Sequence, residues 1–206
     1  MLPAKISRFT ARTWKVHIEG ITPILFNNES AMVLNPKKER SMSYEEFEEK
    51  YWLNKAHLSH EGNVLLPSTW FKKAMIVSQA KSAVPIQPKT SRSKMETLKN
   101  YLTASVFIED SLVTIDGKVL TKEGLIKFAK GVNRGTPSQP KKVITIRPSC
   151  PHNWKATVTF TDTEGGLTLE NIYEIFAWIG SRNGLGDWRV SRGGTFGMFK
   201  VVDIEE

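Results

Sequence analysis

The fold class is decided by residues 154–180, which read WKATVTFTDTEGGLTLENIYEIFAWIG. The first eight residues alternate apolar with polar side chains, which is typical of a strand with one buried face. Its apolar set is Trp154, Ala156, Val158 and Phe160. Thr168 then caps an amphipathic helix that Gly180 ends. The expected buried stripe of this helix is Leu169, Ile172, Ile175, Phe176 and Ile179. The stretch therefore predicts a helix packed on one face of a half-buried sheet.

The same criteria predict elements on either side of this stretch. Strands are expected at residues 14–19, 64–66, 143–147 and 198–204, with a strand pair at 105–120 that turns at Asp116-Gly117. Helices are expected after the capping box at residues 43–46, after Pro67, and at 121–130. Segments 82–100 and 131–142 are expected to be flexible basic loops.

The order of these elements predicts the architecture. When residues 20–62 and 83–142 are set aside, the order is strand, helix, strand, strand, helix, strand. That order is typical of an α+β fold of the ferredoxin-like or RRM-like kind, an antiparallel sheet with helices on one face. We expect a single domain, residues 1–206, with 83–142 as a large basic insertion made of a hairpin and flexible loops.

Positive charge is concentrated in one part of the chain. The net charge is +8 and the isoelectric point is about 9.5. Residues 72–142 hold fourteen Lys and Arg against five acidic residues, a local charge of +9, so the rest of the chain is close to neutral. Concentrated charge favours a nucleic-acid surface more strongly than total charge does.

Several classes of protein are disfavoured by the sequence. No apolar run approaches the roughly 18 residues of a membrane span, and no apolar stretch follows the first charges as in a signal peptide. Cys150 is the one cysteine, so neither an intramolecular disulfide nor a thiolate zinc site is expected. There is no P-loop, nucleophile elbow or HExxH motif, so we expect no cofactor and no metal. The single cysteine makes the cytoplasm the expected location.

The most informative local feature is a glycine-rich stretch at residues 180–200, GSRNGLGDWRVSRGGTFGMFK. Glycines let a backbone approach phosphate, arginines bind phosphate or stack on bases, and exposed aromatic rings stack on bases. The alternative is a plain connector with Trp188 in the core. Under the binding interpretation the stretch contributes Arg182, Trp188, Arg189, Arg192, Gly193, Gly194 and Phe196. The basic segment contributes Lys72, Lys73, Lys89, Arg92, Lys94 and Arg134.

Three segments resemble the RAMP superfamily, the RRM-like proteins of CRISPR systems. Residues 193–201 (GGTFGMFKV) resemble its C-terminal glycine-rich turn and strand. Residues 21–25 (ITPIL) resemble its Thr-Pro-Leu opening, and residues 65–75 (LLPSTWFKKAM) resemble its Ile-Pro-Gly-Ser-Ser-Leu-Lys-Gly motif. The chain departs from the pattern in lacking the glycine after Pro67 and in having Lys73 at the second glycine, and its target-cleaving Asp loop has no counterpart here.

The resemblance implies a divergent or phage-borne relative of the backbone subunits that coat guide RNA. Such a protein would bind single-stranded nucleic acid, RNA rather than DNA, without catalysis. It would assemble side by side as a homo-oligomer or within a ribonucleoprotein complex, in the cytoplasm of a bacterial or phage-infected host cell, away from membranes.

Other functions remain open from the sequence. Endoribonucleases of the same superfamily process guide RNA without metal, and His17 with Lys155 or Tyr173 is the candidate for such a site. A phage single-stranded DNA-binding or recombination accessory protein would show the same charge pattern. A structural protein whose arginine-rich loop binds another protein is the fourth alternative. The acidic pairs Glu45-Glu46 and Glu48-Glu49 are expected on a solvated helix face.

Overall fold

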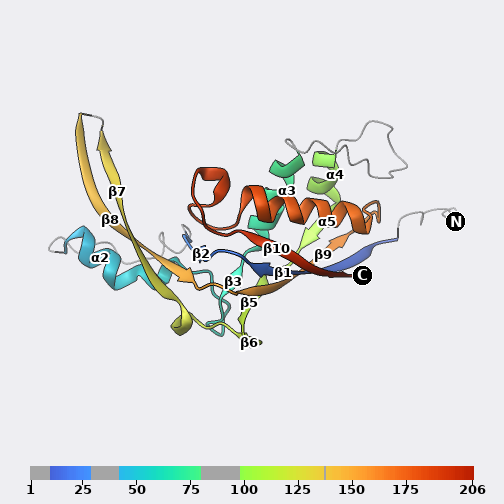
Figure 1. Cartoon of the computed structure of the whole chain (residues 1–206), viewed down its shortest axis with the longest axis horizontal. Helices are drawn as coiled ribbons and strands as arrows, with labels where there is room; N and C mark the ends of the chain where they lie inside the picture. The colour runs from blue at the N-terminus through green and yellow to red at the C-terminus, as the bar shows by residue number, and fades with distance from the viewer. Residues whose placement is uncertain (1–9, 29–41, 80–97, 137) are drawn as a thin grey trace, which may run out of the picture.

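The computed structural model describes residues 10–28, 42–79, 98–136 and 138–206, with an antiparallel seven-stranded sheet at its centre (Figure 1). The sheet runs β10-β1-β9-β5-β3, with β4 beside β9 and β6 beside β5. Its strands are β1 (Arg12–Gly20), β3 (Leu65–Leu66), β4 (Val106–Ile108), β5 (Ser111–Ile115), β6 (Lys118–Val119), β9 (Lys155–Asp162) and β10 (Phe199–Glu205). The last strand lies beside the first, and β9 separates β1 from β4 and β5, as in a ferredoxin-like sheet.

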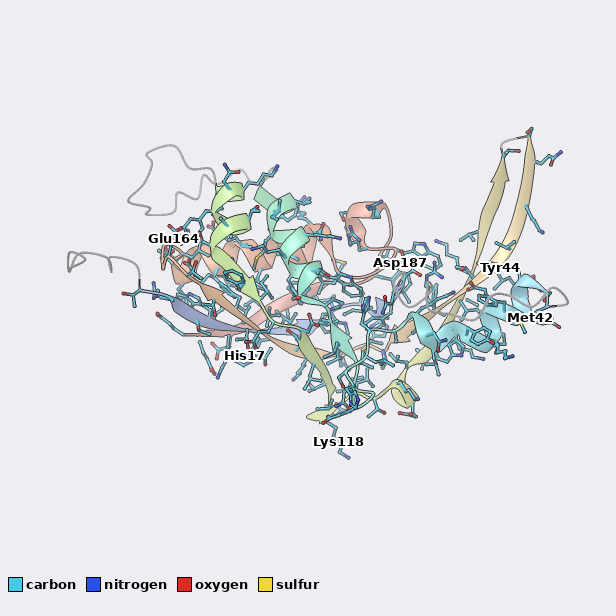
Figure 2. The ribbon with its side chains drawn as sticks, turned by 180° about the vertical axis from the view of Figure 1, so that it is seen from behind. His17, Met42, Tyr44, Lys118, Glu164 and Asp187 are labelled. Carbon is cyan, nitrogen blue, oxygen red and sulfur yellow. The ribbon has the colours of Figure 1, made fainter. Side chains whose placement is uncertain are left out.

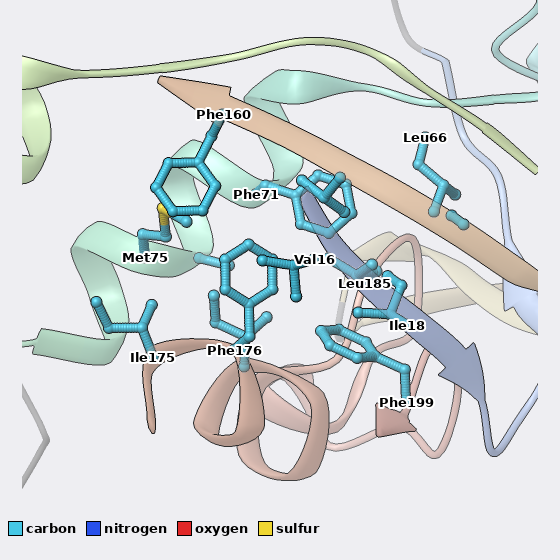
Figure 3. Close-up of a cluster of buried hydrophobic side chains, with 14 of the residues drawn as sticks. Val16, Ile18, Leu66, Phe71, Met75, Phe160, Ile175, Phe176, Leu185 and Phe199 are labelled. Carbon is cyan, nitrogen blue, oxygen red and sulfur yellow. The ribbon is translucent and has the colours of Figure 1, made fainter. Parts of the chain in front are cut away.

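Helices cover one face of this sheet (Figure 1). They are α3 (Ser68–Gln79), α4 (Leu98–Ser105) and α5 (Leu169–Trp178). Thr168 caps α5 as the sequence predicts, and Asn171 completes a reciprocal capping box with it. Figure 3 shows the side chains of Val16, Phe160 and Phe176 meeting between sheet and helices, and all three are at most 1% exposed. The α+β, ferredoxin-like or RRM-like fold is confirmed.

A second, three-stranded sheet extends from the side of this body. It consists of β2 (Ile24–Leu25), β7 (Ile126–Thr136) and β8 (Gln139–Cys150) in the order β2-β8-β7. β7 and β8 form a long hairpin that projects away from the seven-stranded sheet (Figure 1). Helix α2 (Tyr44–Tyr51) and the 3₁₀ turn η1 (Trp52–Lys55) lie against β8. The three-stranded sheet, α2 and η1 together form a side unit, which contains the basic β7–β8 hairpin.

A buried ion pair joins α2 and η1 to β8. The ammonium of Lys55 donates to the carboxylate of Glu48 and to the carbonyl of Ile146, and both charged side chains are 2% exposed. The carboxylate of Glu48 also accepts from the N–H of Ile146 at 2.7 Å and from Tyr44 and Thr145. Burial alone would raise the pKa of Glu48, but these donors hold it below its ordinary value. The ion pair therefore hydrogen-bonds both the N–H and the carbonyl of Ile146 at the edge of β8.

This ion pair corrects the expectation that Glu48 lies on a solvated helix face. The capping box at Ser43 and Glu46 does start α2 as predicted. Glu48 follows two residues later and turns inward toward β8, where Lys55 compensates its charge. The sequence around Glu48 is acidic and therefore suggests a solvated side chain. Its partner cation, Lys55, lies seven residues further along the chain and is brought to it only by the fold.

The basic segment also differs from its expected structure. The predicted helix at 121–130 is wrong, because a short 3₁₀ turn η2 (Lys122–Gly124) leads directly into β7. The predicted flexible loop at 131–142 is wrong as well, since residues 131–136 and 139–142 belong to the two paired strands of the hairpin. The register pairs Lys130 with Thr145 and residue 134 with Lys141, so cross-strand hydrogen bonding replaces the disorder expected from Gly and Pro.

Smaller differences concern where elements begin and end. The strand pair predicted at 105–120 begins at Val106, and its Asp116-Gly117 turn is present between β5 and β6. Both β4 and β5 pair with β9, so part of the stretch expected as an insertion belongs to the main sheet. The strand expected at 143–147 as part of the main sheet lies instead in β8 of the side sheet. Leu169, expected in the buried stripe of α5, is 52% exposed. Gly180 does not end the helix, because a π-helical turn, η3 (Ile179–Asn183), continues from α5. Within the described residues, no helix is long and apolar enough to cross a bilayer.

Candidate nucleic-acid interface

The glycine-rich stretch, residues 180–200, forms a loop (the glycine-rich loop) that packs tightly on itself and on β2. After η3 it passes through a short 3₁₀ turn, η4 (Val190–Arg192), before reaching β10. The N–H of Asp187 donates to the carbonyl of Leu25 at 2.8 Å, and that of Gly197 donates to Pro23 at 2.8 Å. A Cβ on Gly194 would lie 1.5 Å from the carbonyl oxygen of Trp188. Gly194 is therefore required by the packing of the loop itself, independently of any ligand.

An aromatic cluster joins this loop to the projecting hairpin. Phe128 of β7 meets Trp188 at a ring-centroid distance of 5.8 Å and Phe196 at 5.0 Å, both edge to face. The ammonium of Lys130 lies 4.4 Å from the Trp188 ring centre, within the range of a cation–π contact. Arg147 of β8 pairs with Asp187 at 2.8 Å. The two regions predicted separately to bind nucleic acid, the basic segment and the glycine-rich loop, thus meet at one place.

Trp188 is neither fully in the core nor freely exposed. Its backbone adopts a left-handed φ of 47°, which is uncommon for a bulky residue and holds its side chain beside the hairpin. The ring is half-buried, with Phe128 at its edge and Lys130 close to its centre. Phe196 is half-buried in the same cluster. Both predicted stacking residues therefore lie at the surface between loop and hairpin.

The arginines of the loop have different surroundings. Arg189 donates to the carbonyl of Gly186 and to the hydroxyl of Ser191, both at 3.1 Å, and burial lowers its pKa. The side chains of Arg182 and Arg192 are exposed. Gly193 follows Arg192 with a left-handed φ of 76° and open space where a Cβ would lie. Arg192 is thus better placed than Arg189 to exchange water for phosphate.

The basic residues predicted upstream are only partly brought to this place. On α3, Lys73 is exposed, whereas the ammonium of Lys72 donates to the backbone carbonyl of Val106 and burial lowers its pKa. The position of Arg134 is on β7, opposite Lys141. Lys89, Arg92 and Lys94 lie outside the described residues.

A pocket of about 640 Å³ opens between the glycine-rich loop and α3. Its wall on the α3 side includes Trp70 and Lys73, and its wall on the loop side includes Arg189 and Arg192. His57 and Asn27 also line it. Burial lowers the pKa of His57, which keeps its imidazole neutral near pH 7. The pocket combines aromatic rings with cations, the two kinds of group that bind nucleotides.

Several residues of this interface were not predicted. Phe128 and Lys130 were missed because residues 121–130 were interpreted as a helix, whereas residues 126–130 lie in β7. Arg147 lies in a predicted strand without any local sign of a role. His57 and Trp70 come together only through the fold, with ring centroids 5.2 Å apart.

The alternative catalytic residue His17 lies far from this interface (Figure 2). It is on β1, where its Nδ1 is 3.0 Å from the hydroxyl of Thr157 and its Nε2 is 3.4 Å from Glu205. Lys155 is on the same face of the sheet, two positions from Thr157 on β9. Tyr173 is on α5, which covers the opposite face. The fold therefore separates Tyr173 from His17.

No metal-binding cluster is evident in the part of the chain that the structure describes, where no three His, Cys, Asp or Glu side chains gather. Cys150 is fully buried at the end of β8, and burial raises the pKa of its thiol to about 12. Such a thiol stays protonated near neutral pH and is a poor nucleophile. Cys150 is thus a buried residue of the core.

Comparison with known proteins gives structural relatives only. No protein-family model matches the sequence, and no curated protein matches it significantly. The fold is similar to that of a chain in the cryo-EM structure of the Type III-B Cmr-beta bound to cognate target RNA. That alignment has a TM-score of 0.58 and 14% identity, and it covers 95% of this chain and 60% of that chain. A crystal structure of Cmr6 from Pyrococcus furiosus aligns with a TM-score of 0.48 and 9% identity, over 94% of this chain and 98% of that chain.

The first of these alignments supports the RAMP-like fold that the sequence resemblance implies. It extends over 95% of this chain. This chain spans about 60% of the length of its counterpart. At this level of identity the likeness concerns the fold alone.

Proposed function

We propose that this protein binds single-stranded nucleic acid, RNA rather than DNA, at the surface where the glycine-rich loop meets the β7–β8 hairpin. The proposal treats the chain as a divergent member of the RAMP superfamily that works in the cytoplasm. It holds the strand without cleaving it.

One observation carries this proposal: Trp188 and Phe196 of the loop pack against Phe128 of the hairpin, beneath the cation of Lys130. Half-buried aromatic rings flanked by cations are the usual means of binding a strand without reading its sequence, since every base has a face to stack. Exposed Lys141 and Lys142 of β8 extend the positive charge along the hairpin. A duplex hides its base faces, so this surface favours a single strand.

A binding role agrees better with the geometry than catalysis does. His17, the candidate general base, contacts Thr157 and Glu205 on a sheet face away from the hairpin, and Tyr173 is on the other side of the sheet. A metal-independent nuclease needs its acid and base within hydrogen-bond reach of one scissile phosphate. The preference for RNA rests on the resemblance to CRISPR proteins and on a structural relative that is bound to RNA.

The proposal includes assembly of several copies along one strand, as the resemblance to backbone subunits implies. Light scattering with oligonucleotides of increasing length should then show stepwise growth in mass. A single copy bound at every length would restrict the proposal to a stand-alone module.

The direct test of function is to purify the protein without nuclease treatment, sequence the nucleic acid that accompanies it, and measure its affinity for labelled single strands and duplexes. We expect co-purifying RNA and a clear preference for single-stranded RNA over duplex. The same RNA should remain intact after incubation with and without Mg²⁺. Equal affinity for duplex and single strand would contradict the binding mode, and cleavage lost in His17→Ala would replace it with the endoribonuclease alternative.

A further inference from the structure

We propose that the groove between α5 and the edge of β10 docks an extended segment of a partner protein that carries both apolar and basic side chains. The segment adds to the seven-stranded sheet as a further strand beside β10. This inference goes beyond the proposed function, because it assigns a protein contact to side chains that take no part in the proposed nucleic-acid surface.

The strand β10 forms one edge of the seven-stranded sheet. It pairs with β1 along one side, and among the described residues no strand pairs with its other side. The N–H of Ile204 donates to the carboxylate of Asp203 at 2.8 Å, a bond that lies within β10 itself. An edge strand offers its backbone donors and acceptors to an incoming strand, which is how many proteins capture extended peptides.

The groove beside this edge has apolar walls. It has a volume of about 450 Å³, and α5 packs next to β10 along it (Figure 1). Leu169 and Tyr173, one turn apart on α5, line one wall and are 52% and 54% exposed. Val202 lines the β10 wall and is 57% exposed. Large apolar side chains that are exposed next to one another mark an interaction site.

The charge of the groove indicates the chemistry of its partner. Glu170 and Glu174 line it from α5 and Asp203 lines it from β10, and no basic residue is among the described residues of its lining. None of these three carboxylates forms an ion pair with a cation in the described ranges. The groove is therefore acidic on a chain whose net charge is +8. It attracts a basic segment and repels nucleic acid.

The same charges disfavour a second copy of this chain that docks edge to edge. A two-fold pairing of β10 with β10 would bring the Asp203 carboxylates of both copies to one interface, where like charges repel. A segment with lysine or arginine instead pairs with the carboxylates, while its apolar side chains cover Leu169 and Tyr173. The structure thus favours a partner protein of complementary charge.

A short fluorescent peptide of alternating valine and lysine is the probe for this groove. Fluorescence anisotropy measures its binding to the full chain. Glu174→Lys/Asp203→Lys reverses one exposed charge on each wall, and Glu45→Lys/Glu123→Lys reverses two exposed charges elsewhere as the matched control. A second peptide alternates valine with glutamate. A third has the valine–lysine sequence with methylated interior backbone nitrogens, so it keeps its charges but cannot donate to a strand.

We expect the valine–lysine peptide to bind the wild type and the control variant, and to bind Glu174→Lys/Asp203→Lys about tenfold more weakly or less. That variant should gain affinity for the valine–glutamate peptide and should bind RNA like the wild type. No binding of the valine–lysine peptide at millimolar concentration, equal binding by both double variants, or equal binding of the methylated peptide would overturn the inference. In sedimentation velocity without peptide, a wild-type dimer that Tyr173→Glu abolishes would assign the groove to a second copy and also overturn it.

Discussion

The anchor of the hairpin gives a stability prediction that can be worked out in detail. Lys55→Met removes the ammonium that the carboxylate of Glu48 and the carbonyl of Ile146 share. Both side chains of the pair are 2% exposed, so water cannot replace the lost cation. Removing one partner of a buried ion pair costs about 3–5 kcal/mol. For a chain of this length, the melting temperature should fall by roughly 6–20 °C.

The double variant Glu48→Met/Lys55→Met separates the effect of an unpaired buried charge from the effect of losing the hydrogen bonds to the backbone of Ile146. It leaves no unpaired charge, and apolar replacement of a buried ion pair is often neutral. However, the N–H of Ile146 loses its acceptor, while its carbonyl keeps a 3.4 Å contact with Arg147. An unsatisfied buried N–H costs about 1–3 kcal/mol, so the double variant should melt between the single variant and the wild type.

Thermal unfolding followed by circular dichroism at pH 7 measures both variants. Lys50→Met, an exposed lysine on α2, is the matched control and should shift stability by less than about 0.5 kcal/mol. A double variant that melts like the wild type would refute the role of the pair at the edge of β8. A Lys55→Met variant that melts like Lys50→Met would refute the buried ion pair itself.

Three further predictions concern acid stability, stacking and the loop. The folded state holds the pKa of Glu48 below its ordinary value of about 4.3. The contribution of Glu48 to the free energy of unfolding is therefore complete above that pH and is lost as the pH falls through the lower folded value. In an acid titration, the stability of Glu48→Gln should fall less steeply with decreasing pH than that of Glu45→Gln. Trp188→Ala should weaken binding of single-stranded RNA by about 1–3 kcal/mol without changing its salt dependence, and should lower stability by less than the 3–5 kcal/mol typical of a core tryptophan, because the ring is half-buried; an early-melting variant whose folded fraction binds normally would leave stacking to Phe196. Gly194→Val should disrupt the loop and abolish binding because its side chain would collide with the Trp188 carbonyl, whereas Ala at the open position of Gly193 should cost only about 1–2 kcal/mol; equal binding by both variants would contradict this view of the loop.

The core of the fold could be predicted because local patterns and tertiary packing agree there. The alternation in β9 and the capped apolar stripe of α5 each determine one buried face, and the two faces pack on each other. The hairpin could not be predicted in the same way. Its strands contain Gly131, Gly135 and Pro140, which usually indicate turns, and they are ordered by eleven cross-strand pairs that no local signal reveals.

The candidate interface was predictable where its composition is unusual and hidden where it depends on distant contacts. The glycine-rich loop is conspicuous in the sequence, and Trp188 and Phe196 do lie at its surface. Gly194 was assigned to contact with a ligand, although packing inside the loop already requires a glycine at that position. Phe128 and Trp70 are separated from the loop by long stretches of chain, so only the folded structure brings them to it.

The central claim, that the hairpin and the loop together bind the backbone of a single strand, is tested most directly by the salt dependence of RNA affinity. Each phosphate neutralised contributes about 0.7 to the slope of log affinity against log salt for a single strand. Lys130→Ser/Lys141→Ser removes two exposed hairpin cations, and Lys118→Ser/Lys122→Ser removes two exposed lysines at β6 and η2. The account predicts a slope lower by about one unit or more in the hairpin variant and little change in the control variant. Identical slopes for the wild type and both variants, or a wild-type affinity that does not respond to salt, would contradict it.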